Sequence, residues 1–163
     1  MRVCVPAMLE AVSSMRSVVI VATFIWVVMS GQPVEAADVS LCSLFQHPEK
    51  YDGQEITMWV GYRAGFEWSE LACAACDVQQ RIWVDFDAEA KGVRKLKQTD
   101  RFDSLYRLRV RGVFNGKRGH YGHENGWDYL FLVREVLSAK RLWQMSPSQP
   151  KVPVDLEARA CQP

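Results

Sequence analysis

Cys73 and Cys76 point most directly to chemistry, because they form a Cys-x-x-Cys motif. Such a pair could act as a redox dithiol, in which one thiolate attacks a disulfide and the other resolves the intermediate. A redox site of that kind places its first cysteine at the start of a helix, whereas this motif lies between two predicted strands. We therefore favour a structural disulfide, formed either within the pair or with Cys42 and Cys161, and the sequence does not choose the pairing.

A second pattern places His120 and His123 three residues apart on a glycine-rich stretch. With the cysteine pair, these imidazoles have the ligand types of a Cys2His2 zinc site made by Cys73, Cys76, His120 and His123. If the cysteines are oxidised, the histidines could still bind a metal with Glu124 or Asp128. The alternative is a solvated hairpin loop whose histidines bind nothing. No cofactor is therefore the first expectation, and zinc is the second hypothesis.

Three arginines, Arg107, Arg109 and Arg111, alternate along a predicted strand and so share one of its faces. A row of guanidinium groups attracts phosphate, sulfate or carboxylate groups through charge-assisted hydrogen bonds. If Trp59 and Trp83 lie on the same face, the surface combines cations with stacking rings and suits an anionic or glycan ligand. The alternative is an ordinary outer face whose arginines pair with nearby acidic side chains.

The stretch from Gly65 to Glu70 is the best candidate for a recognition loop, because it contains Phe66, Glu67 and Trp68. Exposed aromatic side chains in such a loop either grip a partner or cap one end of a sheet. Two carboxylates in the loop could also do acid–base work. The sequence has neither a glycine-rich phosphate loop nor a Gly-x-Ser-x-Gly elbow, so we expect binding rather than catalysis.

An apolar run over 17–31 follows Met15-Arg16 and is succeeded by Val34 and Ala36, spaced as the −3 and −1 residues of a cleavage site. This pattern predicts a signal peptide over residues 1–36, with a true start that could be Met15. A retained membrane anchor is the rival interpretation, but a span needs about 20 apolar residues. We therefore expect a periplasmic or extracellular protein with oxidised cysteines and no stable membrane span after cleavage.

Residues 37–145 are expected to form one mostly β domain. A short helix is predicted over 40–46, and strands are predicted over 56–62, 82–87, 106–114 and 129–137, three of them with apolar residues at every second position. Glycines inside strands mark bulges or corners, which favours a small closed sheet. The proline-rich tail, residues 146–163, shows no apolar period and is predicted to be extended or disordered, unless Cys161 fixes it.

The segment 47–56, with its turn Tyr51-Asp52-Gly53, and the following Val60-Gly61-Tyr62 are similar to the opening of small bacterial periplasmic OB-fold proteins. The resemblance covers about the first third of residues 37–163. It implies a small OB-fold-like β-barrel with one short N-terminal helix and a loosely defined ligand-binding role. The cysteines and the long tail depart from that group.

Together these patterns predict an exported, non-catalytic binding module for an unknown small molecule, glycan or protein, and an anionic or glycan ligand is one such candidate. The expected binding rim consists of residues 65–70, the loop over 119–128 and the arginine row. A zinc-binding domain is the second hypothesis and a thiol–disulfide redox protein the third. The formal net charge of +1 gives no general attraction to polyanions, so a nucleic-acid partner is not expected.

Overall fold

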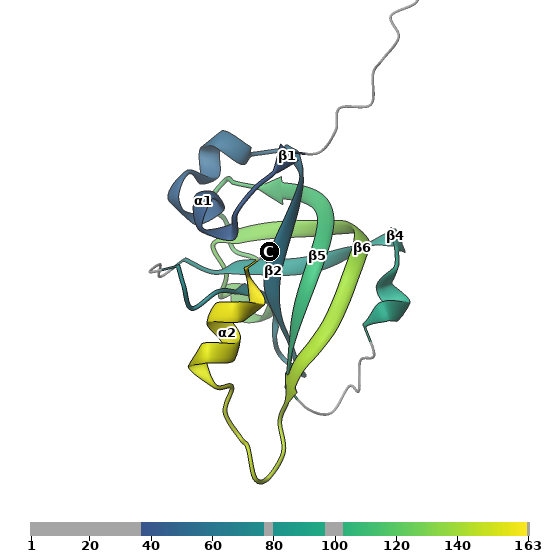
Figure 1. Ribbon diagram of the computed structural model, residues 1–163. Coiled ribbons are helices and arrows are strands. Elements are labelled where there is room, and N and C mark those ends of the chain that lie inside the picture. The colour runs from purple at the N-terminus through teal and green to yellow at the C-terminus, as the bar shows by residue number, and fades with distance from the viewer. Residues whose placement is uncertain (1–36, 77–79, 97–102, 163) are drawn as a thin grey trace, which may run out of the picture. The chain divides into compact units, whose positions relative to one another are not determined.

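Five strands of a mixed sheet close into a ring in the computed structural model, which describes residues 37–76, 80–96 and 103–162 (Figure 1). The strands are β2 (Glu55–Ala64), β3 (Ser69–Ala72), β4 (Ile82–Lys91), β5 (Ser104–Asn115) and β6 (Tyr129–Gln144). Their order is β2-β3-β4-β6-β5, and pairing of β5 with β2 completes the ring. Within the ring only β4 and β6 run parallel. The predicted mostly β fold is confirmed.

The remaining elements lie outside the ring. They are β1 (Ala37–Asp38), α1 (Leu41–Gln46), α2 (Val154–Ala160) and three short 3-10 helices, η1 (Pro48–Tyr51), η2 (Val93–Lys95) and η3 (His123–Asn125). β1 adds to β2 in parallel. The predicted signal peptide, residues 1–36, lies outside the described residues.

Helix α1 confirms the predicted short N-terminal helix. Ser40 caps it, because the Ser40 hydroxyl accepts a hydrogen bond from the Ser43 N–H at 3.1 Å. The helix then buries Leu41, Leu44 and Phe45, which the 3.6-residue period places on one face. His47 ends the helix just before Pro48, as expected from the steric restriction that a proline places on the preceding residue.

The core lies inside the ring and is built by strand alternation. On β2 the residues Ile56, Met58, Val60 and Tyr62 are each 2% exposed or less. On β5 the residues Tyr106, Leu108, Val110 and Phe114 are equally buried, while the arginines between them point to the outer face. The predicted alternation on these strands is confirmed.

The C-terminal tail contains α2 and is fixed by the Cys161 disulfide, which is the exception that the sequence left open to an extended or disordered tail. Ala160 is fully buried and packs in a second apolar cluster with Leu105 and Trp143. Gly61 makes the close approach of α2 possible, since a Cβ at that position would lie 3.0 Å from the Ala160 Cβ. Leu156 and Ala160 are four residues apart and so share one face of α2, a signal too short to stand out in the sequence.

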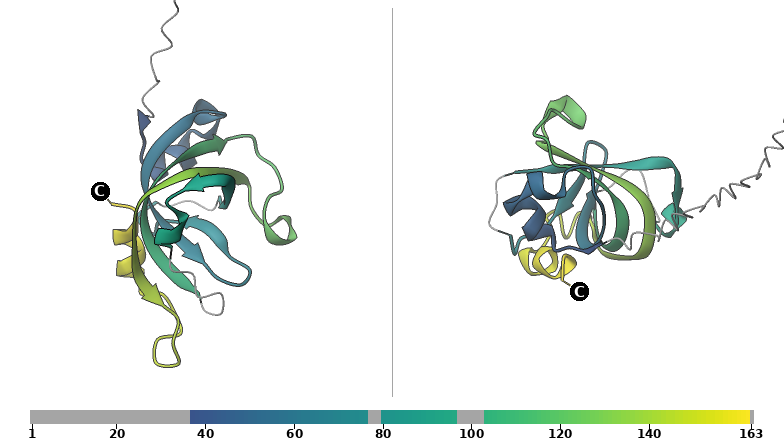
Figure 2. Two further views of the ribbon diagram at one scale, coloured as in Figure 1. Left: turned by 90° about the vertical axis from the view of Figure 1, so that its right-hand side faces the viewer. Right: turned by 90° about the horizontal axis from the view of Figure 1, so that it is seen from above.

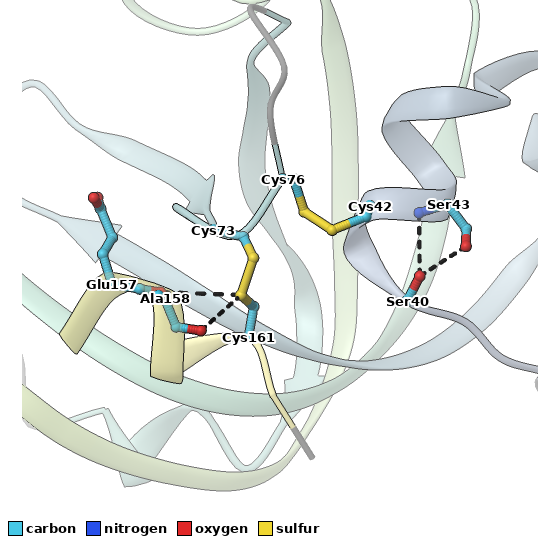
Figure 3. Close-up of a disulfide and its surroundings, with 8 residues drawn as sticks. All are labelled: Ser40, Cys42, Ser43, Cys73, Cys76, Glu157, Ala158 and Cys161. Atoms are coloured by element: carbon cyan, nitrogen blue, oxygen red, sulfur yellow. Dashed lines mark hydrogen bonds between the residues drawn. A yellow bond between two sulfur atoms is a disulfide. The ribbon is translucent and has the colours of Figure 1, made fainter. Parts of the chain in front are cut away.

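Two disulfides attach both helices to the loop that follows β3 (Figure 3). Cys42 of α1 is bonded to Cys76, and Cys73 is bonded to Cys161 at the end of α2. The expectation of structural disulfides shared with Cys42 and Cys161 is confirmed. Bridges of this kind are typical of proteins in oxidising compartments. None of the helices in the described part of the chain is long and apolar enough to cross a membrane.

Candidate functional site

Two loops meet at one end of the ring. One joins β2 to β3 over residues 65–68, and the other joins β5 to β6 over residues 116–128. The rings of Trp68 and Trp127 bring the loops together, with centroids 6.2 Å apart, and His123 Nε2 lies 4.0 Å from Glu67 Oε1. The β5–β6 loop, which carries η3, projects from the ring on the side away from α2 (Figure 2, left).

Three tryptophans and one arginine form the centre of this end, which we call the tryptophan cluster (Trp68, Trp83, Trp127 and Arg81). The rings of Trp83 and Trp127 meet edge to face, with centroids 4.5 Å apart. The Arg81 guanidinium lies 4.1 Å from the Trp127 centroid and 5.5 Å from the Trp68 centroid. Offset or edge-to-face rings with a cation above them are mutually attractive, so the cluster is a preformed aromatic surface.

A buried carboxylate holds the tryptophan cluster in place. Glu70 is 6% exposed, and its Oε2 accepts hydrogen bonds from Arg81 Nη2 at 2.7 Å and from the Trp127 indole N–H at 2.8 Å. Its Oε1 accepts a longer bond from Arg63 Nη1 at 3.3 Å. A buried carboxylate is tolerated only when it is paired and hydrogen-bonded, and here these donors satisfy it. Its role is therefore structural.

Gly122 lets the β5–β6 loop lie directly against the cluster. The residue has a φ of +70°, and a Cβ there would lie 2.3 Å from Trp83 Cε3 and 2.7 Å from Trp127 Cε3. Only glycine combines this backbone conformation with so close an approach. Gly122 thus fixes the position of the predicted histidine loop.

A polar pocket of about 440 Å³ opens within the β5–β6 loop. It is lined by Arg118, Gly119, His120, Asn125, Gly126, Trp127 and Asp128. Two hydrogen bonds fix the orientation of the Asp128 carboxylate. Its Oδ1 accepts a hydrogen bond from Arg118 Nε at 2.8 Å, and its Oδ2 accepts one from the Arg81 backbone N–H at 3.2 Å. The pocket therefore offers fixed donors and acceptors beside the aromatic surface.

The predicted recognition loop is the exposed edge of this site. Phe66 is 87% exposed and Trp68 is 37% exposed, so both present apolar surface to solvent. Trp68 also contacts the tryptophan cluster, whereas Glu67 faces His123 of the neighbouring loop. Trp127, which Trp68 contacts, lines the polar pocket, and a pocket lined by an aromatic side chain and a few polar groups is characteristic of ligand sites.

The arginine row lies elsewhere, on the outer face of β5. Arg107 stacks over Trp59 at 4.5 Å, Arg109 pairs with Asp38 at 3.4 Å, and Arg111 pairs with Glu135. A pocket of about 390 Å³ beside the row is lined by Asp38, Val39, Ser40, Trp59, Arg109 and Cys161. The structure thus brings Trp59 to the arginines.

Trp83 does not share that face. It lies on β4, which pairs with β3 and β6 and not with β5, and its ring contacts Trp127. The predicted ligand-binding residues are therefore divided between two surfaces. Strand alternation could place Trp83 outside the core, but it could not reveal which strands would become neighbours in the ring.

The four predicted zinc ligands are not brought together. Among the described residues, one group of three possible ligands has its ligand atoms within 4.8 Å of one another, and it consists of Cys42, Cys73 and Cys76. All three of these sulfur atoms are in disulfides, so none is a thiolate. His120 and His123 belong to the β5–β6 loop, outside this group. The Cys2His2 arrangement is therefore corrected.

The Cys-x-x-Cys pair is likewise not closed on itself. Cys76 is bonded to Cys42 of α1, and Cys73 is bonded to Cys161 at the end of α2. The motif itself lies in the loop between β3 and β4 and not at the start of a helix. Sequence reasoning missed Arg81 as a site residue, and it included Trp127 only as an unnamed member of the predicted binding loop over 119–128. A signal for Trp127 was present, because it follows the turn dipeptide Asn125-Gly126 directly.

No protein-family model, curated protein or solved structure matches this chain.

Proposed function

We propose that this protein is an exported, non-catalytic binding domain with an OB-fold-like barrel, and that it binds a glycan at the tryptophan cluster. Support for the fold comes from the ring order β2-β3-β4-β6-β5 and the short helix α1. OB folds bind oligosaccharides and oligonucleotides on their second and third strands and on the loops after the first and fourth strands. In this ring those elements are β3, β4 and the two loops that meet at the tryptophan cluster.

The observation that carries the proposal is the contact between the exposed Trp68 and Trp127, which lines the polar pocket. Sugar rings combine apolar faces with hydroxyl edges, so they suit an aromatic surface beside fixed hydrogen-bonding groups. Trp68 supplies the aromatic surface, Phe66 adds exposed apolar surface on the same loop, and Asp128 and Asn125 supply polar groups. Charged side chains at this end are paired with each other, as in the ion pairs Arg81–Glu70 and Arg118–Asp128. Because these charges are neutralised within the protein, the site favours a neutral ligand over a highly charged one.

Export supports the choice of ligand. Two disulfides suit an oxidising compartment outside the cytoplasm, where glycans are accessible. The apolar run over 17–31 and the small residues that follow it support a cleaved leader.

The test is a screen of immobilised neutral and acidic oligosaccharides, followed by calorimetric titration of each sugar that binds. We expect Phe66→Ala and Trp68→Ala to weaken binding by about tenfold each, since one stacked ring contributes about 1–3 kcal/mol. Val154→Ala is the matched control, because Val154 is an apolar residue of α2 with 73% exposure. Failure of every sugar to bind, or equal loss in the control, would reject the glycan site.

A second candidate is an anionic ligand on the arginine row. The observation that favours it is that the Nε atoms of Arg107 and Arg109 are buried and have no hydrogen-bond partner among the described residues. The pocket lined by Trp59 and Arg109 lies beside them. Sulfated and non-sulfated forms of one oligosaccharide distinguish the two sites. Binding that requires sulfate and is lost in Arg109→Gln would assign the ligand to the arginine row.

A further inference from the structure

Three sulfur atoms lie together beside α1, although only two of them are bonded to each other (Figure 3). The Sγ atoms of Cys42, Cys73 and Cys76 are all within 4.8 Å of one another. Cys42 and Cys76 share one disulfide, while Cys73 is bonded to Cys161 (Figure 3). The two disulfides are therefore neighbours. The Cys73 sulfur is the atom of the Cys73–Cys161 bond that lies close to the Cys42–Cys76 bond.

The backbone of the β3–β4 loop creates this arrangement. The Cys76 N–H donates a hydrogen bond to the Cys73 carbonyl at 3.1 Å, so the motif forms a tight turn with both sulfur atoms close to each other. Cys161 reaches Cys73 from the end of α2 and is not a member of the three-sulfur group. Cys73 therefore has two alternative partners, Cys161 and Cys76.

We propose that this group is a thiol–disulfide exchange site, at which opening of the Cys73–Cys161 bond leads Cys73 to displace Cys42 from Cys76. The co-reactant is an external thiol, either a small molecule or a protein. Its thiolate attacks Cys161 Sγ, forms a mixed disulfide there, and releases Cys73 as a thiolate. The Cys73 thiolate then attacks Cys76 Sγ, forms the Cys73–Cys76 bond, and releases Cys42 as a thiolate.

Each step forms one sulfur–sulfur bond and breaks one, so the number of disulfides stays at two. The external thiol is oxidised into the mixed disulfide with Cys161, and Cys42 is reduced to a thiol. The product holds an internal Cys-x-x-Cys disulfide, and both α1 and α2 have lost their bond to the β3–β4 loop. Packing alone then holds α2, through Ala160 and Leu156. The exchange site uses no residue of the tryptophan cluster and goes beyond the proposed glycan binding.

The experiment compares Cys161→Ser with Cys73→Ser, both with Cys4→Ser, so that the only cysteines are those of residues 37–163. Each folded variant is held at neutral pH, quenched with acid, alkylated with N-ethylmaleimide and digested with trypsin. Cleavage after Arg63 and Arg81 leaves Cys73 and Cys76 on one peptide. Mass spectrometry then separates an internal Cys73–Cys76 disulfide from a bond to the Cys42 peptide.

In Cys161→Ser the free Cys73 thiol lies against the Cys42–Cys76 bond. We expect the internal Cys73–Cys76 disulfide to form in this variant, and alkylated Cys42 to reach a level about tenfold or more above that in Cys73→Ser. In Cys73→Ser the free thiol is Cys161, which lies outside the three-sulfur group, so Cys42–Cys76 should persist. Alkylation confined to Cys73 in the first variant, or equal exchange in both, would overturn the proposal.

A third sample covers the case in which Cys161→Ser does not fold, which circular dichroism would reveal. The chain with only Cys4→Ser is treated with substoichiometric reduced glutathione and mapped in the same way. We expect glutathione on Cys161 together with the internal disulfide and alkylated Cys42. Molecules that carry glutathione on Cys161 and a free Cys73 thiol, with Cys42–Cys76 still intact, would contradict the exchange.

Discussion

The Trp127 indole N–H donates a hydrogen bond to Glu70 Oε2 at 2.8 Å, across 57 residues of sequence. This bond joins the β5–β6 loop to β3, and the same oxygen accepts from Arg81. The buried Glu70 carboxylate is therefore one of the contacts that hold the loop and its polar pocket in position, together with the close approach of Gly122 to Trp83.

Replacing that carboxylate should destabilise the fold. In Glu70→Gln, the amide NH2 would face donors on Arg81 or Arg63 and could not accept their hydrogen bonds. We expect the free energy of unfolding to fall by about 2 kcal/mol in urea titrations, because bonds to a buried charged group are lost. The control is Glu55→Gln, whose partner Arg134 is half-exposed, and which should cost less than about 0.5 kcal/mol. Equal losses in the two variants would contradict the structural role of Glu70.

The placement of the β5–β6 loop can be tested separately at Gly122. A methyl group there would collide with Trp83 and require an unfavourable positive φ. We expect Gly122→Ala to alter tryptophan fluorescence and to weaken glycan binding.

Gly126→Ala is the matched control in the same loop. Its Cβ would lie 3.6 Å from the nearest atom, His123 O, and its φ of −83° is ordinary, so the variant should keep the fluorescence of the parent. A fluorescence change of the same size in both alanine variants would indicate that the loop does not rest on Trp83.

The two disulfides should contribute differently to stability. They bridge sequence separations of 34 and 88 residues, and loop-closure entropy assigns about 4 kcal/mol to Cys42–Cys76 and about 5 kcal/mol to Cys73–Cys161. Chemical unfolding of the double serine variants of each pair would measure these values. The variant with Cys73→Ser and Cys76→Ser loses both bonds and should be the least stable. A stability unchanged from the parent would refute the structural role of both bonds.

A metal chelator should leave the folded state intact. The structure does not bring Cys73, Cys76, His120 and His123 together, and the cysteines are oxidised. Thermal unfolding with and without EDTA should therefore coincide. A lower melting temperature with EDTA, reversed by added zinc, would instead support the zinc hypothesis, because a structural metal contributes its binding energy to folding.

The sequence by itself determined the strands that alternate strictly and the helix that has a clear cap. On β2 and β5, apolar residues at every second position show which side chains are buried, and Ser40 marks the start of α1. These features depend on neighbours within a few residues, so they can be recognised locally. The short β3 was missed because four residues carry too little periodic signal. Helix α2 was missed because it has no side-chain cap and buries only Ala160, whereas α1 has a cap and three buried apolar residues.

Only the tertiary structure decided which residues meet. The four cysteines allow three pairings, and the choice followed from the positions of α1 and α2 beside the β3–β4 loop. Trp83 joined Trp127 instead of the arginine row because β4 pairs with β6 and not with β5. Contacts of this kind join residues tens of positions apart, and strand order in a ring is set by the packing of the whole core, which no local pattern records.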